Sequence, residues 1–505
     1  MSKLAVLVVA AALAGCGSSA ALSPAVSLGP PPTGAAARPG AGSTAGNLTT
    51  YHYDNARSGD DTVDPVFTKF RPLWTDRLID GAVYAEPLVW HGEVVVATED
   101  DLVYGLDARN GHVMWRTRIG RPVPSQSLES PPGPGCGDIF PLGITGTPVI
   151  DISRGELFAA GEVQDPHRGG AAGVEHVLAA VRLSSGRLLW ERRIDPPGAG
   201  RVYQVAALQQ RSALSLVSGR VVVEFGGLDG DCGDYHGYVE SLPESRSGRA
   251  YTYRVPTARE GAIWAVSGAV SEPSGKIYVA TGNGSSTTRF DYGDSVIDLS
   301  RRLRPLGFFA PRDWAALNAG DLDLGAGGPI LLRSLNLIFE SGKVNENGVN
   351  VGYLLDPSRL GGIGHPRFSA TACPGNGNRV FGAFASATEL SHGRRSVFLY
   401  VPCVAGTTAF VVSGGRRPSF RRVWTVAKND PNGPPIVAGG LVWALSTGND
   451  GGAQSNLLTG MRPTTGRVVV TEQLGDIGVV NFATPAVGDR RLFVAGSKGV
   501  AAFGD

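Results

Sequence analysis

Apolar residues along this chain occur in short runs that come in pairs, with a few polar or glycine residues between the two runs of each pair. Runs of this length fit buried strands better than a helical stripe, which needs a longer segment. A strand pair that recurs along the whole chain is typical of a β-propeller or a solenoid. The first runs of the pairs are Pro87-Leu88-Val89, Pro148-Val149-Ile150, Pro435-Ile436-Val437 and Pro485-Ala486-Val487, with looser copies at Gly268-Ala269-Val270 and Pro329-Ile330-Leu331.

A turn glycine followed four residues later by a large side chain closes several of these units. Gly111 precedes Trp115 and Gly186 precedes Trp190, while Gly466 precedes Val470 in the tryptophan position. Glycine supplies the positive φ that a hairpin turn requires. We expect the large side chain to face inward and fill the gap between adjacent blades.

The repeats predict an all-β protein, an eight-bladed β-propeller. The stretch 482–503 supplies three strands, and residues 71–75 with Trp74 look like an orphan fourth strand. Pairing the two stretches closes the ring with an N-terminal strand and leaves no free edge. Seven blades remain the alternative, because the units at 211–256 and 325–365 are degenerate. The seven complete units are 85–120, 146–196, 211–256, 261–310, 325–365, 380–427 and 433–475.

The first fifty residues predict export and anchoring. Residues 4–14 are an apolar run too short to span a bilayer, preceded by Lys3. The sequence Leu13-Ala14-Gly15-Cys16 resembles the lipobox of bacterial lipoproteins. We therefore expect a lipoprotein signal peptide at 1–15, lipidation at Cys16, a disordered tether of small residues over 16–50, and a propeller over 51–505. The protein would be extracytoplasmic and anchored to the cell-envelope membrane.

Composition supports strands and turns and excludes a nucleic-acid partner. The chain has 71 glycines and 34 prolines, and its formal net charge is +1 with both signs interspersed. Apart from Cys16, the cysteines favour two disulfides in an exported protein, and three pairings are possible. Cys136–Cys232 is preferred because both lie in Cys-Gly-Asp sequences, and Cys373–Cys403 because they flank one hairpin-like stretch.

Over residues 70–505 the repeats resemble the quinoprotein-type (PQQ-like repeat) β-propeller superfamily. That superfamily contains dehydrogenases using pyrroloquinoline quinone (PQQ) and calcium, and non-catalytic lipoproteins of outer-membrane assembly. The resemblance implies that Trp264 would stack on the quinone and that Glu162 and Asn283 would bind calcium. Lys343 could neutralise an anionic ligand. Each residue also has a structural interpretation: core packing for Trp264, a left-handed turn for Asn283, and a solvated carboxylate or amine for Glu162 and Lys343.

Two departures argue against an enzyme. The family's catalytic base falls at Ala315, which cannot accept a proton, and the adjacent cysteine pair of many alcohol-oxidising members is absent. Asp313 is a weak substitute for the base, as are Asp321 and Asp323 in the same long segment, 311–325. We therefore expect a lipid-anchored binding or scaffold protein that lacks this base. Its partners would be the membrane, through the anchor, and an envelope protein, a polymer or a small ligand. The alternative is a PQQ- and calcium-dependent alcohol or sugar dehydrogenase with a rearranged site.

Overall fold

The computed structural model describes residues 26–27, 46–128, 136–198, 202–427, 433–448 and 455–505. The expected signal peptide and Cys16 lie outside these ranges. None of the helices within them is both long and apolar enough to cross a membrane.

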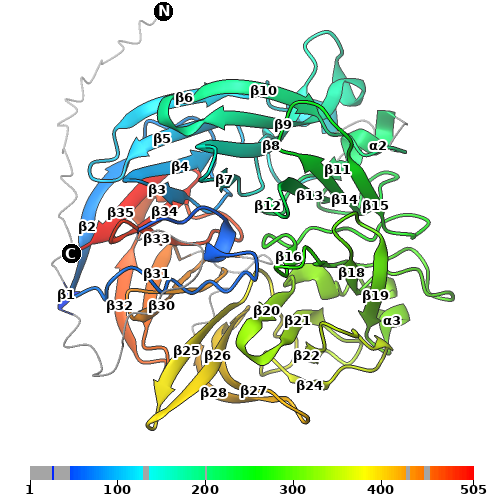
Figure 1. Ribbon diagram of the computed structural model, residues 1–505, viewed down its shortest axis with the longest axis vertical. Coiled ribbons are helices and arrows are strands. Elements are labelled where there is room, and N and C mark those ends of the chain that lie inside the picture. The colour runs from blue at the N-terminus through cyan, green and yellow to red at the C-terminus, as the bar shows by residue number, and fades with distance from the viewer. Residues whose placement is uncertain (1–25, 28–45, 129–135, 199–201, 428–432, 449–454) are drawn as a thin grey trace, which may run out of the picture.

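Eight antiparallel sheets surround a central axis and form an eight-bladed β-propeller (Figure 1), as the repeats predicted. Blades 1 to 4 have these strands: β3 (Leu88–Trp90), β4 (Glu93–Ala97), β5 (Leu102–Asp107) and β6 (Val113–Arg118) in blade 1; β7 (Val149–Asp151), β8 (Glu156–Gln164), β9 (Val174–Arg182) and β10 (Arg187–Arg193) in blade 2; β11 (Leu208–Gln209), β12 (Ser215–Leu216), β13 (Arg220–Gly227), β14 (Tyr238–Pro243) and β15 (Tyr251–Arg254) in blade 3; β16 (Val270–Ser271), β17 (Ile277–Ala280), β18 (Val296–Leu299) and β19 (Pro305–Ala310) in blade 4.

Blades 5 to 8 complete the ring, and short helices lie in the connections. The strands are β20 (Ile330–Leu332), β21 (Leu337–Val344), β22 (Asn350–Leu355) and β24 (Phe368–Thr371) in blade 5; β25 (Ala385–Ser391), β26 (Arg394–Cys403), β27 (Gly406–Ser413) and β28 (Ser419–Ala427) in blade 6; β29 (Ile436–Ala438), β30 (Leu441–Leu445), β31 (Leu457–Met461) and β32 (Val468–Gln473) in blade 7; β33 (Ala486–Gly488), β34 (Arg491–Gly496), β35 (Gly499–Gly504) and β2 (Lys69–Asp76) in blade 8. The α-helices are α1 (Ser125–Leu128), α2 (Val202–Ala207) and α3 (Trp314–Gly320).

The two chain ends meet in blade 8, which confirms the predicted closure. β2 pairs antiparallel with β35, and Trp74 lies opposite Ala502. In Figure 1 the blue strand β2 lies beside the red strands of the C-terminus. β1 (Val26–Ser27) adds to the outer side of β2, inside the stretch expected to be a tether.

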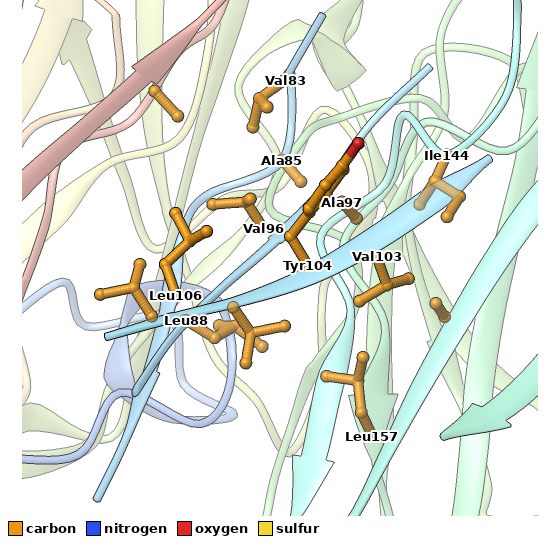
Figure 2. Close-up of a cluster of buried hydrophobic side chains, with 14 of the residues drawn as sticks. Val83, Ala85, Leu88, Val96, Ala97, Val103, Tyr104, Leu106, Ile144 and Leu157 are labelled. Atoms are coloured by element: carbon orange, nitrogen blue, oxygen red, sulfur yellow. The ribbon is translucent and has the colours of Figure 1, made fainter. Parts of the chain in front are cut away.

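Burial increases from the outer strand of a blade to its inner strands. β4 is buried throughout, whereas most residues of β6 are exposed. The apolar side chains of neighbouring blades pack face to face between the sheets. Figure 2 shows one such layer, where Val96 and Val103 of blade 1 lie in the same cluster as Ile144 and Leu157, which belong to the entry loop and second strand of blade 2. Burial of these faces is the main stabilising contribution to each junction between blades.

Tryptophans fasten one blade to the next, as expected. The ring of Trp74 in blade 8 covers Gly111 in the turn of blade 1, and its Nε1 donates to the Ala108 carbonyl at 3.0 Å. Trp115 covers Gly186 of blade 2 in the same way, and Trp424 covers Gly466 of blade 7. Glycine is therefore required in this turn for two reasons: its φ is positive, and a side chain there would collide with the tryptophan ring.

Blade 5 differs from the predicted unit 325–365. Its outer strand β24 lies beyond residue 365, because β23 (Gly362–Ile363) instead pairs parallel with β19 of blade 4. The predicted unit ended at residue 365, but the chain crosses to the neighbouring sheet before it forms the outer strand.

Residues 46–61 form an N-terminal segment that lines the axis, so chain packing begins before Tyr51. Leu48 is fully buried and exchanges two backbone hydrogen bonds with Val89, because the inner edge of β3 offers unpaired groups. The composition of residues 16–50 indicated a tether, and it did not indicate that the apolar Leu48 would be buried. The segment bonds to the innermost part of every blade: Leu48 with Val89, Thr49 with Ile150, Arg57 with Ser215, Asn55 with Ser271, Ala56 with Leu331, Ser58 with Ser386, Gly59 with Val437, and Tyr53 with Val487.

Candidate functional site

Three of the four residues suggested for a cofactor site gather on one side of the axis. Lys343, at the end of β21, lies between two carboxylates, with Nζ 2.7 Å from Asp323 Oδ2 and 2.8 Å from Asp321 Oδ1. The backbone nitrogen of Asn283 donates to the other oxygen of Asp323 at 2.8 Å. Trp264 reaches the same place, because its indole nitrogen lies against Gly282, where an added methyl group would overlap the Asp323 carboxylate.

The carboxylates hold Lys343 as a cation. Burial lowers its pKa, but the charges of Asp323 and Asp321 prevail and raise the pKa above the ordinary value. Desolvation by the surrounding loops and the charge of Asp323 raise the pKa of Asp321 to about 6. The protein's own carboxylates thus neutralise the charge of Lys343. The solvated amine considered from the sequence is wrong, because the Lys343 side chain is only 14% exposed.

Trp264 is flanked by two aromatic rings from other blades. Its ring centroid lies 6.5 Å from that of Phe381 and 6.1 Å from that of Phe482, and these two phenylalanines are 6.1 Å apart. Arg211 lies over Phe482 at 4.6 Å. Below them, between Phe482 and Tyr51 of the N-terminal segment, the axial cavity has a volume of about 10 Å³, room for one water.

Glu162 lies apart from this group, in a pair with a histidine. It is fully buried in β8 directly opposite His176 of β9, with His176 Nε2 3.6 Å from Glu162 Oε1. The backbone nitrogen of Gln210 donates to the same oxygen, and His176 Nδ1 lies 2.9 Å from Asp195 Oδ1. Burial lowers the pKa of His176, but the bonds to Asp195 and Glu162 outweigh it and raise the pKa to about 10. The solvated carboxylate considered for Glu162 is therefore wrong as well.

The segment around Ala315 divides between two places. Ala315 lies in α3, which in Figure 1 is at the periphery beside β19. Asp313 precedes α3, where burial and then the charge of Asp313 raise the pKa of Tyr353. Asp321 and Asp323 follow the helix and reach Lys343. Of the carboxylates considered as substitutes for the base, the last two are at the site and Asp313 is with Tyr353.

Further carboxylates lie near Lys343, on loops joined by a disulfide. Both disulfides have the preferred pairing, Cys136–Cys232 and Cys373–Cys403. The first joins the loop before blade 2 to the β13–β14 loop, and Gly137 donates to the Asp229 carbonyl at 3.0 Å. Partial burial and the neighbouring charge of Asp138 raise the pKa of Asp229.

We call this group of carboxylates the acidic mouth; it consists of Asp138, Asp229, Asp231, Glu260, Asp321 and Asp323. The Asn283 side-chain nitrogen lies 3.3 Å from Asp231 Oδ2 and 3.5 Å from Glu260 Oε2. Burial raises the pKa of Glu260; Arg259 opposes this, and the charges of Asp231 and Asp321 add to it. These residues therefore share one electrostatic environment.

Sequence reasoning missed the two phenylalanines and Arg211. Each lies a few residues before the innermost strand of its blade, as Trp264 does: Arg211 before β12, Phe381 before β25 and Phe482 before β33. Comparing this position across the repeats would have found them. The missed carboxylates had a weaker signal, the acidic composition of residues 229–234.

Comparisons with known proteins agree with the fold. Residues 70–227 match the family model described as outer membrane protein assembly factor BamB. No curated protein matches the sequence significantly. Quinohemoprotein alcohol dehydrogenase ADHIIG from Pseudomonas putida HK5 is a similar solved structure, with 13% identity and a TM-score of 0.62 over 91% of this chain and 80% of that chain. A europium-containing methanol dehydrogenase has 15% identity and a TM-score of 0.61 over 90% of each chain. BamB from Moraxella catarrhalis has 12% identity and a TM-score of 0.50 over 86% of this chain and 97% of that chain.

The fold and its fastened blades define an eight-bladed β-propeller of the quinoprotein type. The chain resembles the PQQ-like β-propeller superfamily: residues 70–227 match the BamB family model, and solved structures of dehydrogenases and of BamB share its fold. At these identities the similar structures establish the fold, and the site must be judged on its own residues.

The residues present do not fit the quinone and calcium that this superfamily suggests. Trp264 has Phe381 and Phe482 beside it, and Lys343 already has two carboxylate partners. Glu162 is directed to His176 and Gln210, away from the contacts of Asn283. Within the described ranges, no three side chains of His, Cys, Asp or Glu lie close enough together to hold a metal ion. We therefore derive no redox step through this site.

Proposed function

We propose that this protein is a lipid-anchored, extracytoplasmic propeller that binds a cationic ligand at its acidic mouth and performs no chemistry on it. The observation that carries the proposal is the position of Lys343 between Asp321 and Asp323. A lysine neutralised in this way has no charge to offer an anionic quinone. The other carboxylates then determine the electrostatic potential of the acidic mouth.

Charge around the mouth supports a cationic ligand. Six carboxylates gather there with four cations, and the exposed Asp138 and Asp229 have no cation within salt-bridge distance among the described residues. Aromatic rings at the centre add a second attraction, because cations bind favourably over their faces. A basic segment of an envelope protein or a basic polymer would meet both features. The carboxylates are Asp138, Asp229, Asp231, Glu260, Asp321 and Asp323, and the cations are Arg211, Arg259, Lys343 and Arg379.

Two observations support the proposed location outside the cytoplasm. Structural disulfides are typical of oxidising compartments, and this chain has two. The Leu13-Ala14-Gly15-Cys16 sequence supports the lipid anchor.

The ligand class can be tested with a fluorescently labelled oligolysine peptide followed by anisotropy at low ionic strength. The variant D138N/D229N removes two exposed mouth charges, and should weaken binding about fivefold, since two exposed charges contribute about 1 kcal/mol together. The control E191Q/E346Q removes two exposed carboxylates elsewhere and should change affinity less than twofold. Equal weakening in both variants would contradict a specific mouth.

A second titration tests the competing dehydrogenase. The purified protein is mixed with PQQ and calcium, and quinone binding is measured together with dye-linked oxidation of an alcohol panel. We expect neither binding nor oxidation. Tight, calcium-dependent quinone binding that Asn283→Ala abolishes would overturn the proposal.

A further inference from the structure

Away from the mouth, the outer rims of blades 3 and 4 enclose a groove of about 410 Å³. We call it the arginine groove; it is lined by Arg249, Ala250, Tyr251, Thr252, Arg302 and Arg304. Half of these residues are cationic and none is acidic. The volume is many times that of one water, about 30 Å³, so a ligand of several heavy atoms can enter.

The lining arginines are exposed and have no carboxylate partner. Arg249, Arg302 and Arg304 form no ion pair with any carboxylate in the described ranges, whereas Arg168 and Arg193 on blade 2 each pair with Glu175. Unpaired like charges around one hollow repel one another, and an anion between them relieves that repulsion. Three guanidinium groups also supply the forked donors that bind phosphate oxygens in pairs.

The floor of the groove is held in place by interactions that do not use Arg302 or Arg304. Arg220 of β13 lies over the Tyr251 ring at 4.6 Å, and its Nη2 donates to the Arg249 carbonyl at 2.7 Å. Arg249 lies over the same ring at 5.6 Å. Tyr251 is therefore a platform between two guanidinium groups, and it fixes the backbone from which Arg249 extends.

One acidic side chain lies beneath the groove. Glu240 accepts a hydrogen bond from Thr252 Oγ1 at 2.7 Å and is 2% exposed. Burial raises its pKa to about 7, with Thr252 and the charge of Arg192 opposing this shift. It therefore carries at most one charge against the three cations of the rim, and its contact with Thr252 occupies one of its oxygens.

We propose that the arginine groove binds a phosphate-bearing anion, either the headgroup of an anionic lipid or a soluble polyphosphate. An apolar residue of β19, Leu306, is 59% exposed two positions after Arg304 in the chain. This inference is independent of the acidic mouth, which has the opposite charge and lies on different loops.

The test uses the chain from Gly17 onward, so that neither the apolar segment 4–14 nor a lipid on Cys16 contributes to vesicle binding. Binding is measured to phosphatidylcholine vesicles with and without phosphatidylglycerol, and to inorganic polyphosphate. The variant R302Q/R304Q should bind at least tenfold more weakly to whichever probe the parent chain prefers, and R302K/R304K should be intermediate because lysine lacks the fork. The control R394Q/R395Q removes the same charge from an exposed hairpin of blade 6.

Loss confined to the groove variant supports the proposal, with vesicles identifying a lipid source and polyphosphate a soluble one. If neither probe binds, or if R394Q/R395Q loses as much affinity as R302Q/R304Q, the proposal is overturned. Because all the substituted arginines are exposed, melting temperatures should agree among the variants and show that each one folds.

Discussion

The imidazole of His176 is fully buried between Asp195 and Glu162, and there it is a cation. Removing a charge from water is unfavourable unless partners compensate, and the two carboxylates do so. The interaction joins β8, β9 and the residues after β10 inside blade 2. Its effect on stability must therefore depend on the protonation of one ring.

Stability should fall as pH rises from about 6.5 to about 10. The folded-state pKa of His176 is about 10, above its ordinary 6.5, so the folded state binds a proton that the unfolded state releases in this interval. The contribution is fully present below pH 6.5 and is lost by about pH 10, with a size of about 3–5 kcal/mol. Urea denaturation at several pH values measures it. His176→Gln should flatten the dependence, while the exposed His112→Gln should leave it unchanged; equal slopes in all three proteins would contradict the assignment.

At the scale of elements, the contact between a tryptophan and a turn glycine is what joins blade to blade. Trp74 over Gly111 and Trp424 over Gly466 repeat the same geometry at distant places in the ring. Neither residue of such a pair can be changed alone, because the ring lies where a Cβ would be. This explains why the sequence repeats glycine and tryptophan at a fixed spacing.

Gly111→Ala should destabilise the protein more than Gly219→Ala. Both glycines have positive φ, +77° and +73°, so both variants incur backbone strain of about 1–2 kcal/mol. At Gly111 the new methyl also meets Trp74 Cε3 at 2.6 Å, whereas nothing lies within 4 Å at Gly219. Overpacking should therefore add about 1–3 kcal/mol at Gly111 alone. Thermal or urea unfolding of the two variants checks the difference, and equal losses would show that Trp74 moves aside freely.

The strand pairs, the closing strand and both disulfides could be predicted because each rests on residues that repeat or lie near one another in the chain. The blade 5 boundary could not, since β23 pairs with a strand of another blade. At the site, sequence indicated Trp264, Asn283 and Lys343, but not that Asp321 and Asp323 neutralise the lysine. That fact depends on where a loop returns after α3, and no local pattern encodes it. Burial of Glu162 depends likewise on His176, across a hairpin.

At the scale of the whole molecule, the N-terminal segment connects the inner strands of all blades. Arg57 is 1% exposed and donates to Thr50 Oγ1, Leu214 O and Ser215 Oγ. Burial lowers its pKa, and the nearby charge of Glu224 opposes that shift. The Arg57 side chain thus connects two parts of the N-terminal segment with each other and with blade 3.

Arg57→Ala should lower the free energy of unfolding by about 2–4 kcal/mol, because several buried acceptors lose a charged donor together. Since the segment touches every blade, hydrogen exchange should accelerate in the innermost strands of several blades. The exposed Arg109→Ala is the control and should change stability by less than 1 kcal/mol. Faster exchange restricted to blade 3 would show that the segment does not couple the ring.

Propellers can gain or lose a blade when a repeat is duplicated or deleted. In this protein, eight of the twelve residues from Leu48 to Gly59 form hydrogen bonds with the inner edges of eight different sheets. A ring of seven blades would leave one of these hydrogen-bonding groups without its partner, because each blade bonds to a different residue of the segment. A segment that is not itself a repeat is therefore matched to the number of blades. A dozen residues at the start of the fold favour a ring of eight.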